Sequence, residues 1–486
     1  MNKIVIVGGG SAGWMSAAAL INAFPEKDIS VIESPNFPTV GVGESTLQFI
    51  RPWMHNLGIK DSDWMEECNA TYKTSIKFTN WDGQGGHYHH PFGEPVLDNN
   101  YGLDFFNFAR LQEDVPNNEW AEVFYPAALM AENNLLVEKM VGWNLHQNSA
   151  YHFDATKFAQ WLKNKYCIPK GVKVITDTVK EIDVETYGIA RLHCELYRNK
   201  TAITADLFID CTGFKALLAN AVGSSFRDYS QGLINDSAWA TQIPETQPDV
   251  YHTNCTTLEN GWVWNIPTKE RTGTGYVFSS KYVSDEDALN EFKKHLDRDD
   301  KLEYKLLKWK HGRRNKLAFK NVVTVGLSAG FIEPLESNGL FLTHETLKEL
   351  IKVMQRGVLN GGDKNSFNYT MGVRFDDFAD FVAMHYQYAT RSDTPYWKDA
   401  HKYKLNNNNV CNTFYESMHR DAMVNARHNH FNSIAFGSGV NTVSQYDADW
   451  ESLFGNADMI AEGVQHRTYL LQRQKKWLEY MKEHSI

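Results

Sequence analysis

The chain opens with Lys3-Ile4-Val5-Ile6-Val7-Gly8-Gly9-Gly10-Ser11-Ala12-Gly13, and this stretch decides the fold. The run Lys3–Val7 is apolar and β-branched, as is typical of a buried parallel strand. The helix-prone segment Trp14–Phe24 follows the glycines, and Ile29–Glu33 has the pattern of a second short strand. Strand, glycine turn, helix and strand together predict a βαβ unit that binds a dinucleotide.

Each glycine in this turn has an expected task. Gly8 makes the tight turn, Gly10 lets the backbone approach a pyrophosphate, and Gly13 lets the helix pack close to the strand. Glu33 closes the second strand, where its carboxylate can accept hydrogen bonds from ribose hydroxyls. The start of the helix supplies amide donors and a partial positive charge to the pyrophosphate.

Two later segments of the sequence help to decide whether the dinucleotide is FAD or NAD. Asp206–Gly213 and Val323–Ser328 resemble the second and third flavin-contacting segments of FAD enzymes. The sequence contains no second GxGxxG motif for a nicotinamide, so FAD is favoured.

Composition excludes several classes of protein. The 486 residues predict two or three packed regions, and a formal charge of −10 argues against binding nucleic acid. The six cysteines are widely spaced, which is typical of free thiols in a reducing compartment. No run reaches the roughly 18 apolar residues that span a bilayer, so a cytoplasmic protein without a membrane segment is expected.

Further elements follow from local patterns. Strands are expected in Val172–Val184, Ile189–Tyr197, Ala205–Asp210 and Val322–Val325, of which the last two can extend the first sheet. Helices are expected at Leu340–Leu359 and Asp458–Glu483.

The segment Gly261-Trp262-Val263-Trp264-Asn265-Ile266-Pro267 matches the WxWxIP signature of flavin-dependent halogenases, the tryptophan halogenase family. The chain resembles this family over most of its length. Further matching segments lie at Gly8–Trp14, Gly41–Ser45, Tyr72–Phe78, Phe331–Ser337 and Arg391–Trp397.

The resemblance implies an α/β fold with a Rossmann-like, flavin monooxygenase-like FAD-binding domain over residues 1–340. Substrate-lining segments at about 45–160 and 225–315, including a β-sheet, are expected as insertions in that domain. A mainly helical region, residues 341–486, is expected to complete the substrate site.

The resemblance also implies the chemistry. Reduced FAD from a separate NAD(P)H-dependent flavin reductase, O2 and chloride or bromide give hypohalous acid, which Lys73 captures or orients. Glu336 then assists as the base that removes the ring proton, and Lys77 is expected to be a bystander.

The resemblance assigns the remaining site residues. The cofactor-binding residues are Gly8, Gly10, Ser11, Ala12, Gly13, Glu33, Val42, Gly43, Glu44, Ser45, Val179, Leu327 and Leu340. The halide-binding residues are Ser337, Asn338 and Gly339. The substrate-lining residues are His90, Phe92, Trp262 and Trp264.

The substrate is expected to be a small, indole-like aromatic. Tryptophan-specific relatives hold the amino-acid head with a Tyr-Tyr pair, a Glu and a Trp, whereas Asn412–Gly439 contains neither that pair nor a Trp. An unpaired charged head would be costly in a buried site, which favours indole over free tryptophan.

Three alternatives bear on this reading. An aromatic hydroxylase and a non-catalytic flavin-binding protein remain open as functions, and a homodimer as an assembly. His87, His89 and His90 lie close together, but no cysteine or carboxylate stands nearby at ligand spacing, so no metal site is expected.

Overall fold

The computed structural model describes residues 1–36, 43–96, 120–196, 202–247, 249–298, 301–357, 359–389, 391–402 and 457–486. The chain forms two compact units. The first comprises Met1–Ala70, His152–Asp236 and Leu307–Ala379, and the second comprises Thr71–Tyr151, Ser237–Leu306 and Asp380–Ile486. These boundaries do not coincide with the predicted boundary at residue 340, and the predicted domain division remains a prediction.

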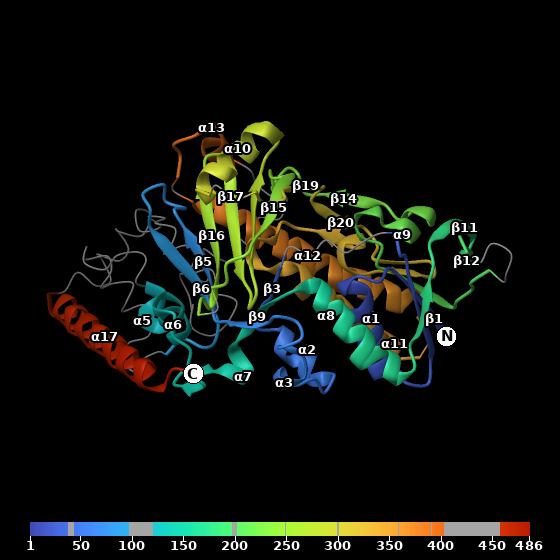
Figure 1. Ribbon diagram of the computed structural model, residues 1–486, viewed down its shortest axis with the longest axis horizontal. Coiled ribbons are helices and arrows are strands. Elements are labelled where there is room, and N and C mark those ends of the chain that lie inside the picture. Colours follow the sequence, from blue (N-terminus) through green and yellow to red (C-terminus); the bar gives the residue numbers. More distant parts are fainter. Residues whose placement is uncertain are drawn as a thin grey trace. The chain divides into compact units, whose positions relative to one another are not determined.

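A six-stranded sheet organises the first unit (Figure 1). Its order is β10 (Lys173–Thr176), β2 (Asp28–Glu33), β1 (Lys3–Val7), β13 (Leu207–Asp210), β22 (Val322–Thr324) and β21 (Ala318–Phe319). The first five strands pair in parallel, and β21 runs antiparallel to β22. The prediction that the two distant runs extend the first sheet is therefore confirmed.

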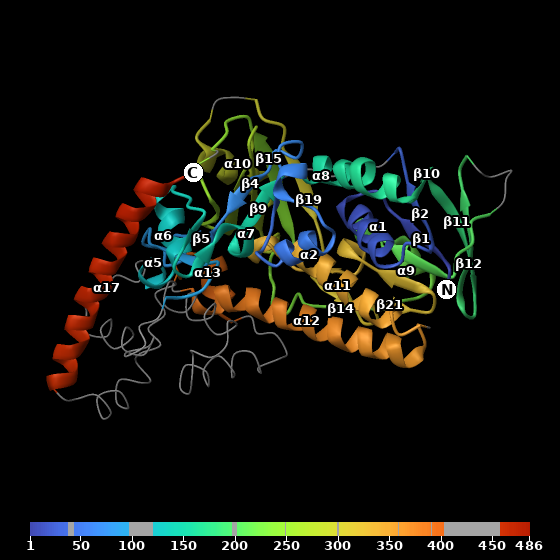
Figure 2. The same ribbon diagram turned by 90° about the horizontal axis from the view of Figure 1, so that it is seen from below.

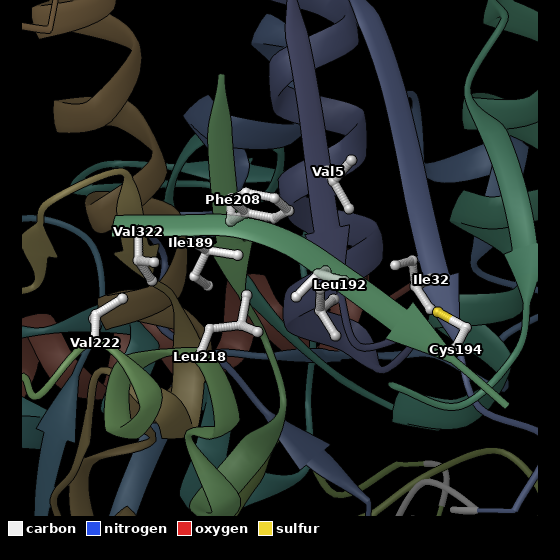
Figure 3. Packing of buried hydrophobic residues seen from close by; sticks show 10 residues of the cluster. Val5, Ile32, Ile189, Leu192, Cys194, Phe208, Leu218, Val222 and Val322 are labelled. Carbon is white, nitrogen blue, oxygen red and sulfur yellow. The ribbon is translucent and has the colours of Figure 1, made fainter. Parts of the chain in front are cut away.

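The two faces of β1 contribute to different parts of the core. Val5 and Val7 join a buried cluster, so Ile4 and Ile6 point to the opposite face. Figure 3 shows Val5, Ile32, Phe208 and Val322 meeting side chains from β12 (Gly188–Cys194) and from α9 (Leu217–Ala221). Partly buried residues of β11 (Val179–Glu185), the partner strand of β12, pack against the same cluster.

Helices complete the first unit. Figure 2 shows α1 (Ser11–Ala23) lying along β1 and β2. The other α-helices of this unit are α2 (Ile50–Asn56), α3 (Asp61–Trp64), α8 (Ala155–Trp161) and α11 (Asn338–Met354). Its shorter helices are the π-helix η2 (Leu162–Cys167) and the 3-10 helices η3 (Ile168–Lys170), η4 (Gly213–Lys215), η5 (Gly326–Ser328) and η6 (Pro334–Glu336). It also contains the short strand β3 (Glu44–Ser45) and a three-stranded sheet of β14 (Phe226–Asp228), β20 (Gly312–Arg314) and β23 (Gly330–Phe331).

A seven-stranded sheet organises the second unit, and Figure 1 shows β5, β16 and β17 side by side. Its order is β19 (Lys305–Lys308), β15 (Ser237–Ile243), β18 (Thr272–Phe278), β17 (Gly261–Pro267), β16 (His252–Leu258), β5 (Ser75–Thr79) and β6 (His87–Pro91), with β19 ending just past the unit boundary. The β16–β5 pair is parallel, so two segments far apart in the chain meet in the middle of this sheet. The predicted inserted β-sheet is therefore present.

The remaining elements are mostly helical. They are β4 (Thr71–Lys73), α5 (Trp120–Phe124), α6 (Pro126–Asn133), β7 (Lys139–Met140), β8 (Trp143–Asn144), α7 (Leu145–Asn148), β9 (Ala150–Phe153), α10 (Asp285–Leu296), α12 (Gly361–Tyr388), α13 (Pro395–Ala400) and α17 (Ala457–His484). The predicted C-terminal helix is confirmed as α17, where Leu470 packs among Val123, Phe124 and Ala128. Among the described residues, no helix is long and apolar enough to cross a membrane.

Candidate active site

The glycine turn after β1 has the form that a dinucleotide site requires. A Cβ atom on Gly8, whose φ is +119°, would lie 2.2 Å from the Cys211 carbonyl oxygen. One on Gly13 would lie 1.8 Å from the Gly8 carbonyl oxygen. At Gly10, by contrast, no described atom lies within 4 Å of such a Cβ. Gly8 and Gly13 are thus required by the chain's own packing, whereas the space at Gly10 is open for a ligand.

The carboxyl ends of three parallel strands converge beside this turn. Cys211 follows β13 and Gly326 follows β22, and a Cβ on Gly326 would lie 2.6 Å from Cβ of Ala12. Leu327, in the same turn, is 41% exposed, so this segment presents an apolar side chain at the strand ends. Ligands of open α/β sheets bind at this edge, where Ser11 and Ala12 also begin α1.

Glu33 closes β2 as predicted, and the structure adds a partner that the sequence analysis missed. Lys163 of η2 donates a short hydrogen bond to Glu33, and its Nζ lies 5.7 Å from the centre of the Trp14 ring. The two residues of the ion pair are 130 positions apart, so no local sequence motif predicts that Lys163 contacts Glu33.

Two predicted binding segments meet within the first unit. Ser45 Oγ lies 2.9 Å from Ser337 Oγ, and a Cβ on Gly339 would lie 3.7 Å from Glu44 Oε1. The Asn338 side chain donates to the Glu333 carbonyl at 2.9 Å, which fixes the start of α11. The fold therefore brings the predicted cofactor segment Gly43–Ser45 to the predicted halide segment Ser337–Gly339.

Glu336 is fully buried at the end of η6, directly before that halide segment. A second buried acid, Glu333, accepts a hydrogen bond from Asn235 Nδ2 at 2.8 Å. Sequence reasoning singled out Glu336 but neither Glu333 nor Asn235, because their pairing spans 98 residues.

The predicted catalytic lysine belongs to the second unit. Lys73 ends β4, is fully buried, and places its Nζ 5.2 Å from the centre of the Phe92 ring. The ring centres of His90 and Phe92 are 6.2 Å apart, and His90 also meets Phe381 at 5.9 Å. Lys73, His90 and Phe92 therefore share one buried, aromatic neighbourhood.

Trp262 and Trp264 lie on the same side of β17, with ring centres 6.3 Å apart. Both are buried, at 0% and 6% exposure. Gly275 stands opposite Trp264 on β18, and a Cβ there would lie 2.3 Å from the Trp264 ring. The indole of Trp264 thus occupies the room that this glycine leaves.

Other predicted residues have different surroundings. Val179 begins β11 and packs against the apolar cluster of Figure 3, and Leu340 is buried in the first turn of α11. Lys77 pairs with Glu132, with Nζ 2.5 Å from Oε1. Val42 and the segment 412–439 lie outside the described residues.

Comparison with known proteins decides the family. The family model described as tryptophan halogenase matches residues 3–460. The chain belongs to the tryptophan halogenase family.

Individual proteins resemble the chain along most of its length. Tryptophan 6-halogenase SttH of Streptomyces toxytricini is 35% identical over 429 residues, covering 82% of this chain and 80% of SttH. The apo structure of VirX1 is 36% identical with a TM-score of 0.87, covering 100% of this chain and 98% of VirX1. BrvH, a flavin-dependent halogenase from Brevundimonas sp. BAL3, is 28% identical with a TM-score of 0.85, covering 100% of this chain and 97% of BrvH.

Family membership confirms the predicted class of enzyme and the α/β flavoprotein fold. The protein is a flavin-dependent halogenase, which uses a flavin and a halide. The glycine turn, the open space at Gly10 and the strand ends around it fit FAD as that flavin.

Proposed function

We propose that the protein halogenates an indole-like ring, with Lys73 presenting the halogen and Glu336 accepting the ring proton. The observation that carries this proposal is the complete burial of Lys73 next to Phe92. Lysine is almost never fully buried unless its ammonium group has a polar partner, because burial removes its hydration. A buried amine surrounded by aromatic rings can hydrogen-bond hypohalous acid and hold it away from water.

The first unit supplies the cofactor and halide positions. Gly8, Gly10, Gly13 and the start of α1 would hold the pyrophosphate, Glu33 the ribose, and Ser337–Gly339 the halide. When bound, reduced FAD from a separate NAD(P)H-dependent reductase would supply two electrons and two protons, so that O2, chloride or bromide and one further proton give hypohalous acid and water.

Hypohalous acid and the aromatic ring are the only reactants in the transfer of the halogen. The ring carbon forms a bond to halogen, the O–X bond breaks, and hydroxide leaves. The carboxylate of Glu336 takes the ring proton, which restores aromaticity, and the net products are the aryl halide and water.

The substrate class follows from what the sequence lacks. SttH is named for tryptophan, yet residues 412–439 of this chain contain no Tyr-Tyr pair and no Trp. We therefore propose that indole or a substituted indole is preferred over free tryptophan.

The test is product analysis by mass spectrometry with reduced FAD, bromide and either indole or L-tryptophan. Lys73→Met should abolish halogenation while FAD binding is retained, and Lys301→Met, at an exposed position of the same unit, should be neutral. Near-normal halogenation by Lys73→Met would refute the role of the lysine. A strong preference for tryptophan would refute the substrate assignment alone.

A further inference from the structure

Four potential metal ligands converge in the second unit. His87 and His89 lie on β6, Glu122 on α5 and Glu132 on α6. One ligand atom from each lies within 4.8 Å of all the others. His87 Nε2 is 3.7 Å from Glu122 Oε1 and 3.3 Å from Glu132 Oε2, and His89 Nε2 is 2.7 Å from Glu132 Oε1.

This cluster is separate from the proposed halogenation site. Side chains alternate across a strand, so His87 and His89 share one side of β6 and His90 points to the other. On that other side, His90 meets Phe92 and Phe381. The cluster therefore has no part in the function proposed above.

The geometry matches a tetrahedral site after small side-chain adjustments. Zinc binds imidazole nitrogen and carboxylate oxygen at about 2.0–2.2 Å, which places tetrahedral ligands about 3.3–3.5 Å apart. The three distances from His87 and His89 to the glutamates bracket this value, at 2.7, 3.3 and 3.7 Å. Two imidazoles and two carboxylates also suit a divalent ion of the first transition row.

A second observation comes from the far side of the His89 ring. Its Nδ1 lies 2.8 Å from Ser75 Oγ, which directs Nε2 towards Glu132. Metal-binding histidines are usually held in this way, with the other ring nitrogen engaged by a neighbouring group.

Two cationic or titratable neighbours bear on the charge of the site. Lys77 lies on β5 opposite His89 and pairs with Glu132 Oε1 at 2.5 Å, so its ammonium competes with a metal for that oxygen. Its side chain is partly exposed and its stem is flexible, so it can turn towards solvent. His252 packs edge-on to His89, with ring centres 6.1 Å apart.

We propose that His87, His89, Glu122 and Glu132 form a binding site for a divalent transition metal of the zinc class, joining α5 and α6 to β6. Bonds from one ion to three elements stabilise their packing, because the binding free energy adds to the free energy of folding. This proposal departs from the sequence-based expectation of no metal site. Glu132 is 43 residues from His89, so no local spacing reveals the ligand set.

The experiment uses the full chain after removal of metals by a chelator, with Zn2+ and Co2+ as probes. One Zn2+ per chain should bind and raise the thermal unfolding temperature, and Co2+ should show the visible absorption of a tetrahedral N/O site. His87→Gln and Glu122→Gln should each weaken binding roughly tenfold or more. Lys77→Met should strengthen binding, because it removes the competing ammonium.

The matched control is His146→Gln, because His146 and Glu138 form an exposed pair, 3.8 Å apart, that belongs to no group of three or more potential metal ligands among the described residues. It should leave the affinity unchanged. Absence of stoichiometric binding, or binding that His87→Gln and Glu122→Gln do not affect, would overturn the proposal. So would weaker binding in Lys77→Met, since a site that needs the lysine is an ion-pair network rather than a metal site.

Discussion

Ser45 Oγ and Ser337 Oγ lie 2.9 Å apart in the interior of the first unit, although 292 residues separate them in the chain. Ser45 follows Glu44 in β3, and Ser337 precedes α11 with a φ of +55°. This single hydrogen bond therefore links the segment proposed to contact the flavin with the segment proposed to hold the halide.

Removing either hydroxyl should destabilise the protein and remove the same interaction. Ser45→Ala and Ser337→Ala should each lower the free energy of unfolding by about 1–3 kcal/mol, because each removes the buried hydrogen bond between the two hydroxyls. The double variant should cost less than the sum, as urea unfolding of all three proteins would measure. Ser225→Ala, at an exposed hydrogen bond to Asn315, should change stability by less than about 0.5 kcal/mol, and strictly additive effects would contradict the coupling.

Because the space at Gly10 is open, a substitution there should affect cofactor binding without affecting stability. A methyl group there meets no described atom within 4 Å, so Gly10→Ala should leave the unfolding temperature of the flavin-free protein nearly unchanged. It should weaken FAD binding at least tenfold, because the methyl group occupies the path of the pyrophosphate. Fluorescence titration with FAD measures this, with Gly361→Ala, another open position, as the control. Normal FAD affinity in Gly10→Ala would place the cofactor elsewhere.

Local patterns were sufficient for much of the first unit. The apolar run Lys3–Val7 and the glycine turn after it need only neighbours in sequence, and both form as predicted. The helix expected to reach Leu359 instead ends at Met354, because Gly357 adopts a φ of +111° and its N–H bonds to the Met354 carbonyl.

Pairings between distant segments were beyond such patterns. The parallel pairing of β5 with β16 places Ser75 beside His252. The local sequence of either strand does not predict that the two strands pair. The same limit applies to the site. Resemblance to a family selected Glu336 and Lys73, whereas Lys163 beside Glu33 and Asn235 beside Glu333 depend on contacts that only the fold creates.

Glu336→Gln should slow the chemical step without loss of the fold. A general base contributes roughly 100- to 10,000-fold, and the amide is similar in size to the buried carboxyl group. Single-turnover formation of brominated indole should therefore fall by about 100-fold or more, with FAD binding retained. Glu349→Gln is the matched control, because Glu349 is also buried and acidic but pairs with Lys352 on α11. Equal rates in the two variants would remove Glu336 from the chemistry.

Gly275 determines where the Trp264 indole lies. A Cβ at this position would lie 2.3 Å from two carbons of that ring and 2.6 Å from the Trp239 carbonyl oxygen, so neither neighbour leaves room for it. Gly275→Ala should therefore lower the free energy of unfolding by about 1–3 kcal/mol, the usual cost of overpacking a core. Because Trp264 must shift, halogenation should fall while FAD binding, which is assigned to the first unit, stays normal.

A second substitution separates the ring from the backbone. Trp264→Phe removes the two ring carbons that the new methyl group meets, so the double variant should recover part of the stability that Gly275→Ala loses. Recovery should be incomplete, since the contact with the Trp239 carbonyl oxygen remains. Thermal unfolding of the two single variants and the double variant measures this coupling. If Trp264→Phe gave Gly275→Ala no relief, the glycine would be required by the backbone of β15 alone, and the position of the indole would have another cause.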